Sequence, residues 1–184
     1  MNTMTHTKRI TVSAVCTALC CVLPTAFHAT GISSALSPMH FPVLLCGLVC
    51  GAWYGLACGV LGPVLCSLLT GMPPAVKLLT MLPELGIYGL MCGVFIRLIR
   101  TKHYALDIYA AMLPSMVLGR IAAGIARTFV YMGSGSTYAL NLWIGSYFVS
   151  SFPAIVCQLI IIPLLVLLLA KTRLIPRRYP LRMK

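Results

Sequence analysis

Apolar runs separated by short polar segments occupy almost the whole chain, and they restrict its fold more than any other feature. Residues 140–170, for example, contain no charged side chain. Hydrophobic residues make up 60% of the sequence and charged residues 9%, with a mean hydropathy of +0.97, which lies outside the range of soluble domains. A helix needs roughly 20 apolar residues to cross about 30 Å of hydrocarbon. We therefore predict an all-α membrane protein with six transmembrane helices in a single bundle, forming one domain over residues 1–184.

The polar and glycine-rich segments set the expected helix boundaries. We predict helices at about residues 10–24, 41–51, 56–70, 75–96, 107–131 and 140–170. Loops at 26–38, 71–74 and 133–137 are expected on the outer side, and the AWYG stretch at 52–55 is expected to form a tight inner turn. The second and third helices are short and carry Gly47, Gly51, Gly55 and Gly59 in steps of four. Small residues let helix backbones approach closely in lipid.

The basic residues indicate the orientation of the chain. The formal net charge is +12, and most of it lies at alternate ends of the predicted helices. These residues precede the first helix, separate the fourth from the fifth, or follow the sixth: Lys8, Arg9, Arg97, Arg100, Lys102, Lys171, Arg173, Arg177, Arg178, Arg182 and Lys184. Because cytoplasmic loops are enriched in Lys and Arg, both termini are expected in the cytoplasm. No soluble face remains to carry a basic patch, which argues against a nucleic-acid partner.

Nine cysteines, an odd number, all lie inside the apolar runs. This placement favours small packing residues between helices over a disulfide framework or a zinc site. The pairs Cys16/Cys20 and Cys46/Cys50 have a spacing that can also bind metal, but neither pair has a histidine on its turn.

Four charged residues, Lys77, Glu84, Arg120 and Arg127, lie within or beside the predicted spans. Each costs at least about a few kcal/mol in lipid unless it is paired or hydrated, so such residues usually face the bundle interior and mark a functional path. Lys77 and Glu84 are seven residues apart on one helix, as are Arg120 and Arg127 on the next. One carboxylate cannot neutralise three cations, and we expect the excess to attract an anionic ligand from outside. Alternatively, Glu84 pairs with one arginine, and Lys77 or Arg127 extends to the outer surface.

Two histidines are expected on the same outer side as the cations. His28 lies in the first outer loop and His40 at the start of the second helix, next to the thioether of Met39. Two imidazoles can bind a metal-centred ligand from opposite faces. Aromatic side chains near the outer ends of the last two helices can stack on a ligand: Tyr131, Tyr138, Trp143 and Tyr147. In the alternative interpretation His28 is exposed, and His40 caps its helix or bonds a carbonyl.

Motifs for ATP hydrolysis or other catalysis are absent from the sequence. It contains no GxxxxGK[ST], HExxH or GxSxG pattern, so we expect a transport component without an ATPase site and not an enzyme. A self-sufficient secondary carrier would need an ion-coupling site, and Glu84 is the main acidic candidate, with Asp107 near the inner edge.

Three stretches resemble a known family: Ala14-x-x-x-Ala18, then PMHFPVLLCGLVCG followed by YGLACGVLGPVLCSLLTGMPP, and MLPELGIYGLMCGV at 81–94. The sequence resembles the substrate-binding S components of energy-coupling factor (ECF) transporters, over about its first hundred residues and beyond them mainly in helix number. The resemblance implies a multi-pass protein of a prokaryotic plasma membrane that captures a micronutrient from outside. It also implies partners, namely a transmembrane coupling protein and two ATPase subunits, with Ala14 and Ala18 on the docking face.

The substrate does not follow from the resemblance, because members of this family bind unrelated compounds. Haem or a related metal tetrapyrrole would use the histidines on iron, the cations on the propionates and the aromatic residues on the ring. It is the favoured substrate, and it would be the only route by which His28 and His40 bind a metal. The alternative is an anionic B-vitamin-like compound such as pantothenate or a folate. No intrinsic cofactor is expected.

Overall fold

Six helices make up the regular structure of the described chain. The computed structural model describes residues 4–28, 37–133 and 152–172. The helices are α1 (His6–His28), α3 (His40–Cys50), α4 (Ala52–Thr70), α5 (Ala75–Leu98), α6 (Tyr104–Gly133) and α8 (Phe152–Lys171). All except α3 are long and apolar enough to cross a membrane. The prediction of an all-helical membrane protein is confirmed. The remaining helix, α3, has 11 residues and is shorter than the roughly 20 that a span needs.

The observed helices are in part longer than predicted. α1 extends past both ends of the predicted 10–24 segment, and α6 adds a turn to 107–131. Of the predicted 140–170 helix, the structure describes residues 152–170, which belong to α8. The predicted turn at 52–55 is wrong, because these residues form the first turn of α4. Gly51 alone reverses the chain with φ 102°, a conformation that side chains with a Cβ rarely adopt.

Small residues bring α3, α4 and α5 into backbone contact, as their spacing predicted. A Cβ added to Gly47 would lie 2.5 Å from the carbonyl oxygen of Gly89. A Cβ on Gly55 would overlap that same carbonyl group, and one on Gly59 would overlap the Leu85 carbonyl. These three helices therefore pack more closely than larger side chains would permit.

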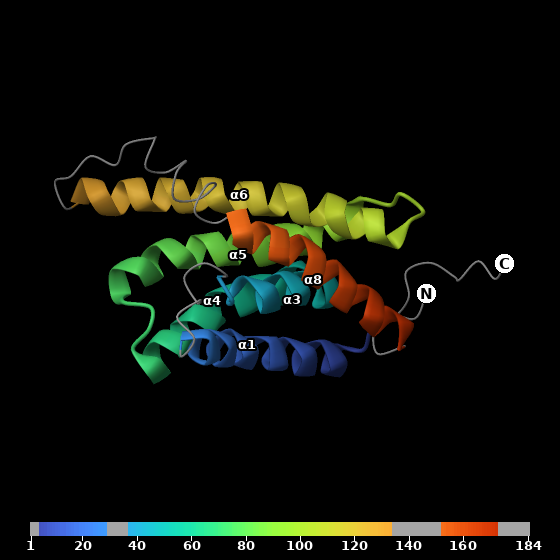
Figure 1. Ribbon diagram of the computed structural model, residues 1–184, viewed down its shortest axis with the longest axis horizontal. Coiled ribbons are helices and arrows are strands. Elements are labelled where there is room, and N and C mark those ends of the chain that lie inside the picture. The colour runs from blue at the N-terminus through green and yellow to red at the C-terminus, as the bar shows by residue number, and fades with distance from the viewer. Residues whose placement is uncertain (1–3, 29–36, 134–151, 173–184) are drawn as a thin grey trace.

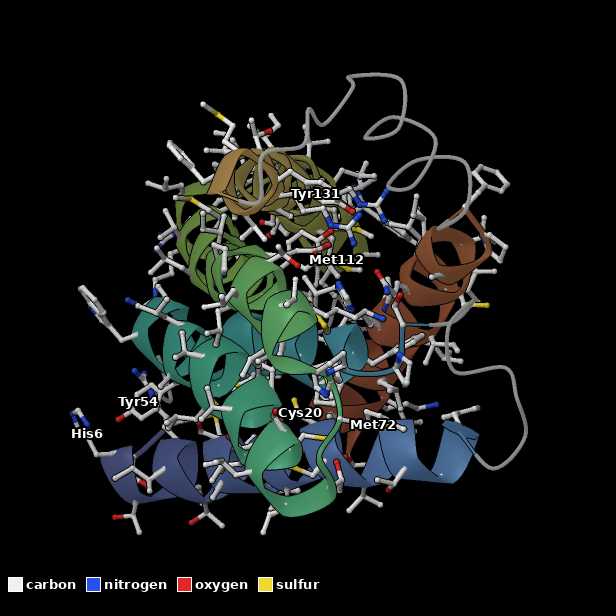
Figure 2. The ribbon with its side chains drawn as sticks, turned by 90° about the vertical axis from the view of Figure 1, so that its left-hand side faces the viewer. His6, Cys20, Tyr54, Met72, Met112 and Tyr131 are labelled. Atoms are coloured by element: carbon white, nitrogen blue, oxygen red, sulfur yellow. The ribbon has the colours of Figure 1, made fainter. Side chains whose placement is uncertain are left out.

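The helices are arranged in layers around α3. Figure 1 shows α6, α5 and α4 running roughly side by side, with α1 beyond α4 and α8 crossing α3 obliquely. α1 crosses beneath α3 and α4 at a steep angle (Figure 2). Eight of the 11 residues of α3 are buried, so this short helix forms the centre of the core. Seven of the nine cysteines are also buried, and all nine are free thiols.

The two ends of the bundle differ in charge. At one end lie the Gly51 turn, the start of α1, the α5–α6 connection and the end of α8 (Figure 1). We call it the Gly51 end. At the opposite end, the Gly71 end, α4 stops and α5 begins, and α6 also stops there (Figure 1). The described members of the basic clusters are all at or near the Gly51 end: Lys8, Arg9, Arg97, Arg100, Lys102 and Lys171.

Candidate functional site

The short helix α3 begins inside the bundle. At about 1.5 Å per residue, its 11 residues rise about 16 Å and the 19 residues of α4 about 28 Å. α3 ends and α4 begins at the turn at Gly51, so the start of α3 lies about 12 Å short of the Gly71 end of α4. His40, its first residue, is only 7% exposed. A residue that the sequence placed at the outer end of a helix therefore lies at depth, because the helix itself is short.

A cluster of four buried polar side chains surrounds the start of α3. It consists of His40 from α3, Glu84 and Tyr88 from α5, and Arg120 from α6. His40 Nε2 lies 3.4 Å from Glu84 Oε1, and the Tyr88 hydroxyl donates to that same oxygen at 3.5 Å. Arg120 Nε donates to the Tyr88 hydroxyl at 3.1 Å. The hydroxyl of Tyr88 thus links the guanidinium of Arg120 to the carboxyl group of Glu84. We call these four residues the polar cluster.

Both ring nitrogens of His40 face oxygen atoms. Nδ1 lies 3.2 Å from the carbonyl oxygen of Ser37, which can only accept a hydrogen bond. The contact between Nε2 and Glu84 therefore needs a proton on one side or the other. A protonated His40 donates in both contacts, whereas a neutral His40 donates only from the ring nitrogen that carries the proton. One ring nitrogen of His40 thus faces a backbone carbonyl, as in the alternative interpretation of the sequence.

Tyr88 is the member of the cluster that sequence reasoning missed. Its side chain is fully buried, and its ring packs edge-on against the His40 ring with the centroids 5.2 Å apart. Gly119 of α6 leaves room for this ring, because a Cβ at position 119 would overlap it. The available signal was spacing: Tyr88 follows Glu84 by four residues, which places both on one face of a helix.

The other predicted site residues lie outside this cluster. Met39 is buried next to His40 in the chain, Arg127 is half-buried on α6, Lys77 is exposed near the start of α5, and Tyr131 is 42% exposed. His28 is the last residue of α1, and its side chain is outside the described part of the structure, as are Tyr138, Trp143 and Tyr147. The structure thus brings together His40, Glu84 and Arg120 from the predicted set.

The two alanines predicted to contact a partner protein lie on the face of α1 that points away from the bundle. Ala14 and Ala18 are exposed, whereas Cys16 and Cys20 between and after them are buried against the bundle. Val15 and Val22 on the same helix are more than half exposed. This face is accessible to a partner protein or to lipid.

Direct metal coordination receives no support from the described side chains. Within residues 4–28, 37–133 and 152–172, no three His, Cys, Asp or Glu residues are arranged to hold a metal ion. Asp107, the second of the two acidic residues in the sequence, is fully buried and accepts from the backbone N–H and the hydroxyl of Thr101, both at 2.7 Å. It therefore has a local structural role at the Gly51 end.

Comparison with protein families identifies the class of this chain. The family described as "ECF transporter, substrate-specific component" matches residues 8–170. No curated protein and no solved structure matches the chain. The matched span includes α1, the α3–α4 pair and α5, where the resemblance was noted, and it continues to the last turn of α8. The protein therefore belongs to the family of substrate-specific components of ECF transporters, which are membrane-embedded, substrate-binding subunits of importers.

Proposed function

We propose that this protein captures an anionic organic micronutrient from outside the cell and delivers it to an ECF module. The observation that carries the proposal is Arg120, a guanidinium only 5% exposed within a lipid-embedded helix bundle. Arginine binds carboxylates with two parallel hydrogen bonds, and such charge-assisted bonds are strong where water is excluded. A buried arginine of this kind is a functional residue by default in a membrane protein.

The balance of charge supports an anionic ligand. Lys77, Arg120 and Arg127 carry positive charge on the half of the bundle between the polar cluster and the Gly71 end, or at its border. Glu84 is the one acidic residue of the sequence in this half, and it lies 3.4 Å from His40 Nε2. An incoming carboxylate would reduce this excess, and it would reach Arg120 beside the start of α3.

The orientation of the chain follows from its basic end. We infer that the Gly51 end faces the cytoplasm of a prokaryotic cell and that the Gly71 end faces outward, because cytoplasmic loops carry an excess of Lys and Arg. The polar cluster then lies within the membrane and on the outward-facing side of α3. Substrate would enter from outside, at the Gly71 end.

An organic acid fits the polar cluster better than haem does. Axial ligation of iron needs a free imidazole nitrogen, but both nitrogens of His40 already contact oxygen atoms. Haem would be accommodated only if His40 exchanged Glu84 for iron, which would leave the Glu84 carboxyl group without that contact. Pantothenate or a folate has no metal to ligate, so a carboxylate beside Arg120 leaves both contacts of His40 in place.

Native mass spectrometry and absorbance of the purified protein test the proposal together. We expect a copurifying organic acid, and we expect Arg120→Gln to weaken its binding about 10- to 100-fold, the effect of losing a charge-assisted hydrogen bond of roughly 1.5–3 kcal/mol. Arg100→Gln, at the exposed Gly51 end, should leave binding unchanged. A haem absorbance band that His40→Ala alters would establish the tetrapyrrole instead. Equal effects of the two arginine substitutions would refute a role for Arg120 in binding.

Uptake requires partners that supply energy. We propose a transmembrane coupling protein and two ATPase subunits, because the family is one of ECF importers and the sequence contains no phosphate-binding loop of its own. Proteoliposomes that contain this chain alone should bind substrate without accumulating it. Sustained gradient-driven uptake by the isolated chain would identify a secondary carrier.

A further inference from the structure

One buried side chain of α8 has an unsatisfied polar group. Gln158 is 1% exposed, and its Oε1 atom has no hydrogen-bond partner among the described residues. A buried amide without a partner costs about 1–3 kcal/mol in mutational data, and the membrane interior provides no bulk water to replace the missing bond. The other such atom, Arg9 Nε, belongs to a half-buried residue at the charged Gly51 end. Gln158 is therefore a buried amide whose oxygen atom forms no hydrogen bond with the described residues.

The position of Gln158 places it on the interior face of α8. Ala154, Gln158, Ile162, Val166 and Ala170 recur every fourth residue and are all buried. This face packs on α3 and α6, the helices that carry His40 and Arg120. In Figure 2, which views the bundle from its end, α6 and α8 flank the interior in which Met112 of α6 lies.

Gln158 and the polar cluster are both buried, on helices that contact one another. α3 and α8 run in the same direction and end near the Gly51 end, at Cys50 and Lys171 (Figure 1). α8 crosses α3 obliquely in Figure 1, and both helices contact α6. Gln158 is therefore suited to contact a ligand that also reaches Arg120.

We propose that Gln158 is a specificity-determining residue that recognises an amide-like edge of the substrate, in which an N–H group lies beside a carbonyl group. A carboxamide offers one acceptor and two donors on adjacent atoms. Its complement is a second amide, a lactam or an N–H heterocycle with a neighbouring carbonyl. Such an edge matches either assignment of the oxygen and nitrogen atoms of the Gln158 side chain, because it carries both a donor and an acceptor.

The proposal rests on the proposed function and narrows its substrate class. A simple carboxylate satisfies Arg120 but can only accept hydrogen bonds, so it leaves a glutamine acceptor without a donor. Haem has no N–H group to offer, since its ring nitrogens are bound to iron. The substrate is then an organic anion that also contains an amide, lactam or N–H heterocycle. Sites that hydrogen-bond a particular polar group reject analogues lacking it more strongly than apolar pockets reject a missing methylene.

The test compares Gln158→Leu and Gln158→Glu with the native protein. Leucine removes both polar atoms at similar volume, and glutamate keeps the shape but loses the N–H donors. Binding is measured by native mass spectrometry for the copurifying compound, and for folate, pantothenate and haemin added to ligand-free protein. We expect the compound that binds to contain an N–H beside a carbonyl, and both variants to weaken its binding at least tenfold.

Thermal unfolding of the ligand-free protein provides an independent measurement. Replacing an unsatisfied buried amide by an apolar group of similar shape is neutral or stabilising, so ligand-free Gln158→Leu should unfold at the same temperature as the native protein or higher. A large decrease would show that Gln158 has a structural partner, and would overturn the proposal.

The outcomes separate this proposal from the proposed function. If Arg120→Gln abolishes binding and Gln158→Leu leaves it unchanged, the bound ligand is an anion but Gln158 does not recognise it. Binding of haemin alone, or of a ligand without an N–H beside a carbonyl, likewise overturns the inference about Gln158. If neither substitution affects binding, the proposed function fails as well.

Discussion

The hydroxyl of Tyr88 joins the two charged members of the polar cluster, and Tyr88→Phe removes that atom alone. The ring remains, so its edge-on packing against His40 and its fit against Gly119 are preserved. Arg120 Nε loses an acceptor at 3.1 Å and Glu84 loses a donor at 3.5 Å. The substitution therefore measures the polar connection without creating a large cavity.

The expected loss of stability follows from these two bonds. A hydrogen bond to a charged group contributes about 1.5–3 kcal/mol in soluble proteins, whereas interhelical bonds inside membranes average about 0.6 kcal/mol. The 3.5 Å contact is long and adds little. We therefore expect Tyr88→Phe to destabilise the ligand-free protein by about 1–2 kcal/mol. For a chain of this size, this corresponds to a decrease in Tm of about 2–8 °C.

The assay is thermal unfolding of the purified protein in detergent, with Tyr109→Phe as the matched control. Tyr109 lies on α6 and is 37% exposed, so loss of its hydroxyl should change Tm by about 1 °C or less. Tyr88→Phe combined with Arg120→Gln should lower Tm by less than the sum of the single effects, because the two side chains share one bond. Equal shifts for the two tyrosine variants, or strict additivity in the double variant, would contradict the role assigned to Tyr88.

Two further predictions concern the helix contacts and the partner surface. Gly55→Ala should lower the free energy of unfolding by about 1–3 kcal/mol, because the new methyl group overlaps the Gly89 carbonyl. Gly86→Ala should have a smaller effect, since its methyl group would meet the movable side-chain tip of Leu56 at 3.3 Å. Equal destabilisation of the two variants in chemical or thermal unfolding would contradict this prediction. Ala14→Trp and Ala18→Trp should retain substrate binding but abolish ATP-driven uptake in proteoliposomes with the ECF module, and normal uptake by both would exclude the exposed face of α1 as the docking surface.

Local rules in the sequence predicted most of the helices but not the reversal at Gly51. The apolar runs were long enough for helix existence to be clear, and the Gly47, Gly55 and Gly59 spacing correctly indicated close backbone contact. The AWYG stretch was interpreted as a turn because it contains a glycine and separates two apolar runs. In the structure one glycine with positive φ suffices, so the remaining residues continue the helix. Hydropathy cannot locate a reversal of this kind, since it depends on the dihedral angles of one residue.

The candidate site was predictable only where helical spacing carried the signal. Glu84 and Arg120 were recognised as charges that lipid would not tolerate, and they lie together in the interior. Lys77 had the same spacing argument in its favour but is exposed, because it lies in the first turn of α5 where the bundle no longer covers it. Gln158 was overlooked because an uncharged side chain in an apolar run gives no sign of whether its amide has a partner. That property depends on neighbouring helices, which the sequence alone does not place.

The depth of His40 connects these observations. A helix that spanned the full bundle would have placed His40 near the outer surface, where water can hydrate it and where it would face ligands directly. The 11-residue α3 instead starts at the level of Glu84, and the peptide N–H and ring Nδ1 of His40 both contact the Ser37 carbonyl group, at 3.1 and 3.2 Å. The backbone at this start needs partners, because lipid and neighbouring apolar side chains offer none. The ring of His40 therefore contacts the backbone at the buried start of α3 and also Glu84, so the length of α3 determines the depth at which a substrate meets the polar cluster.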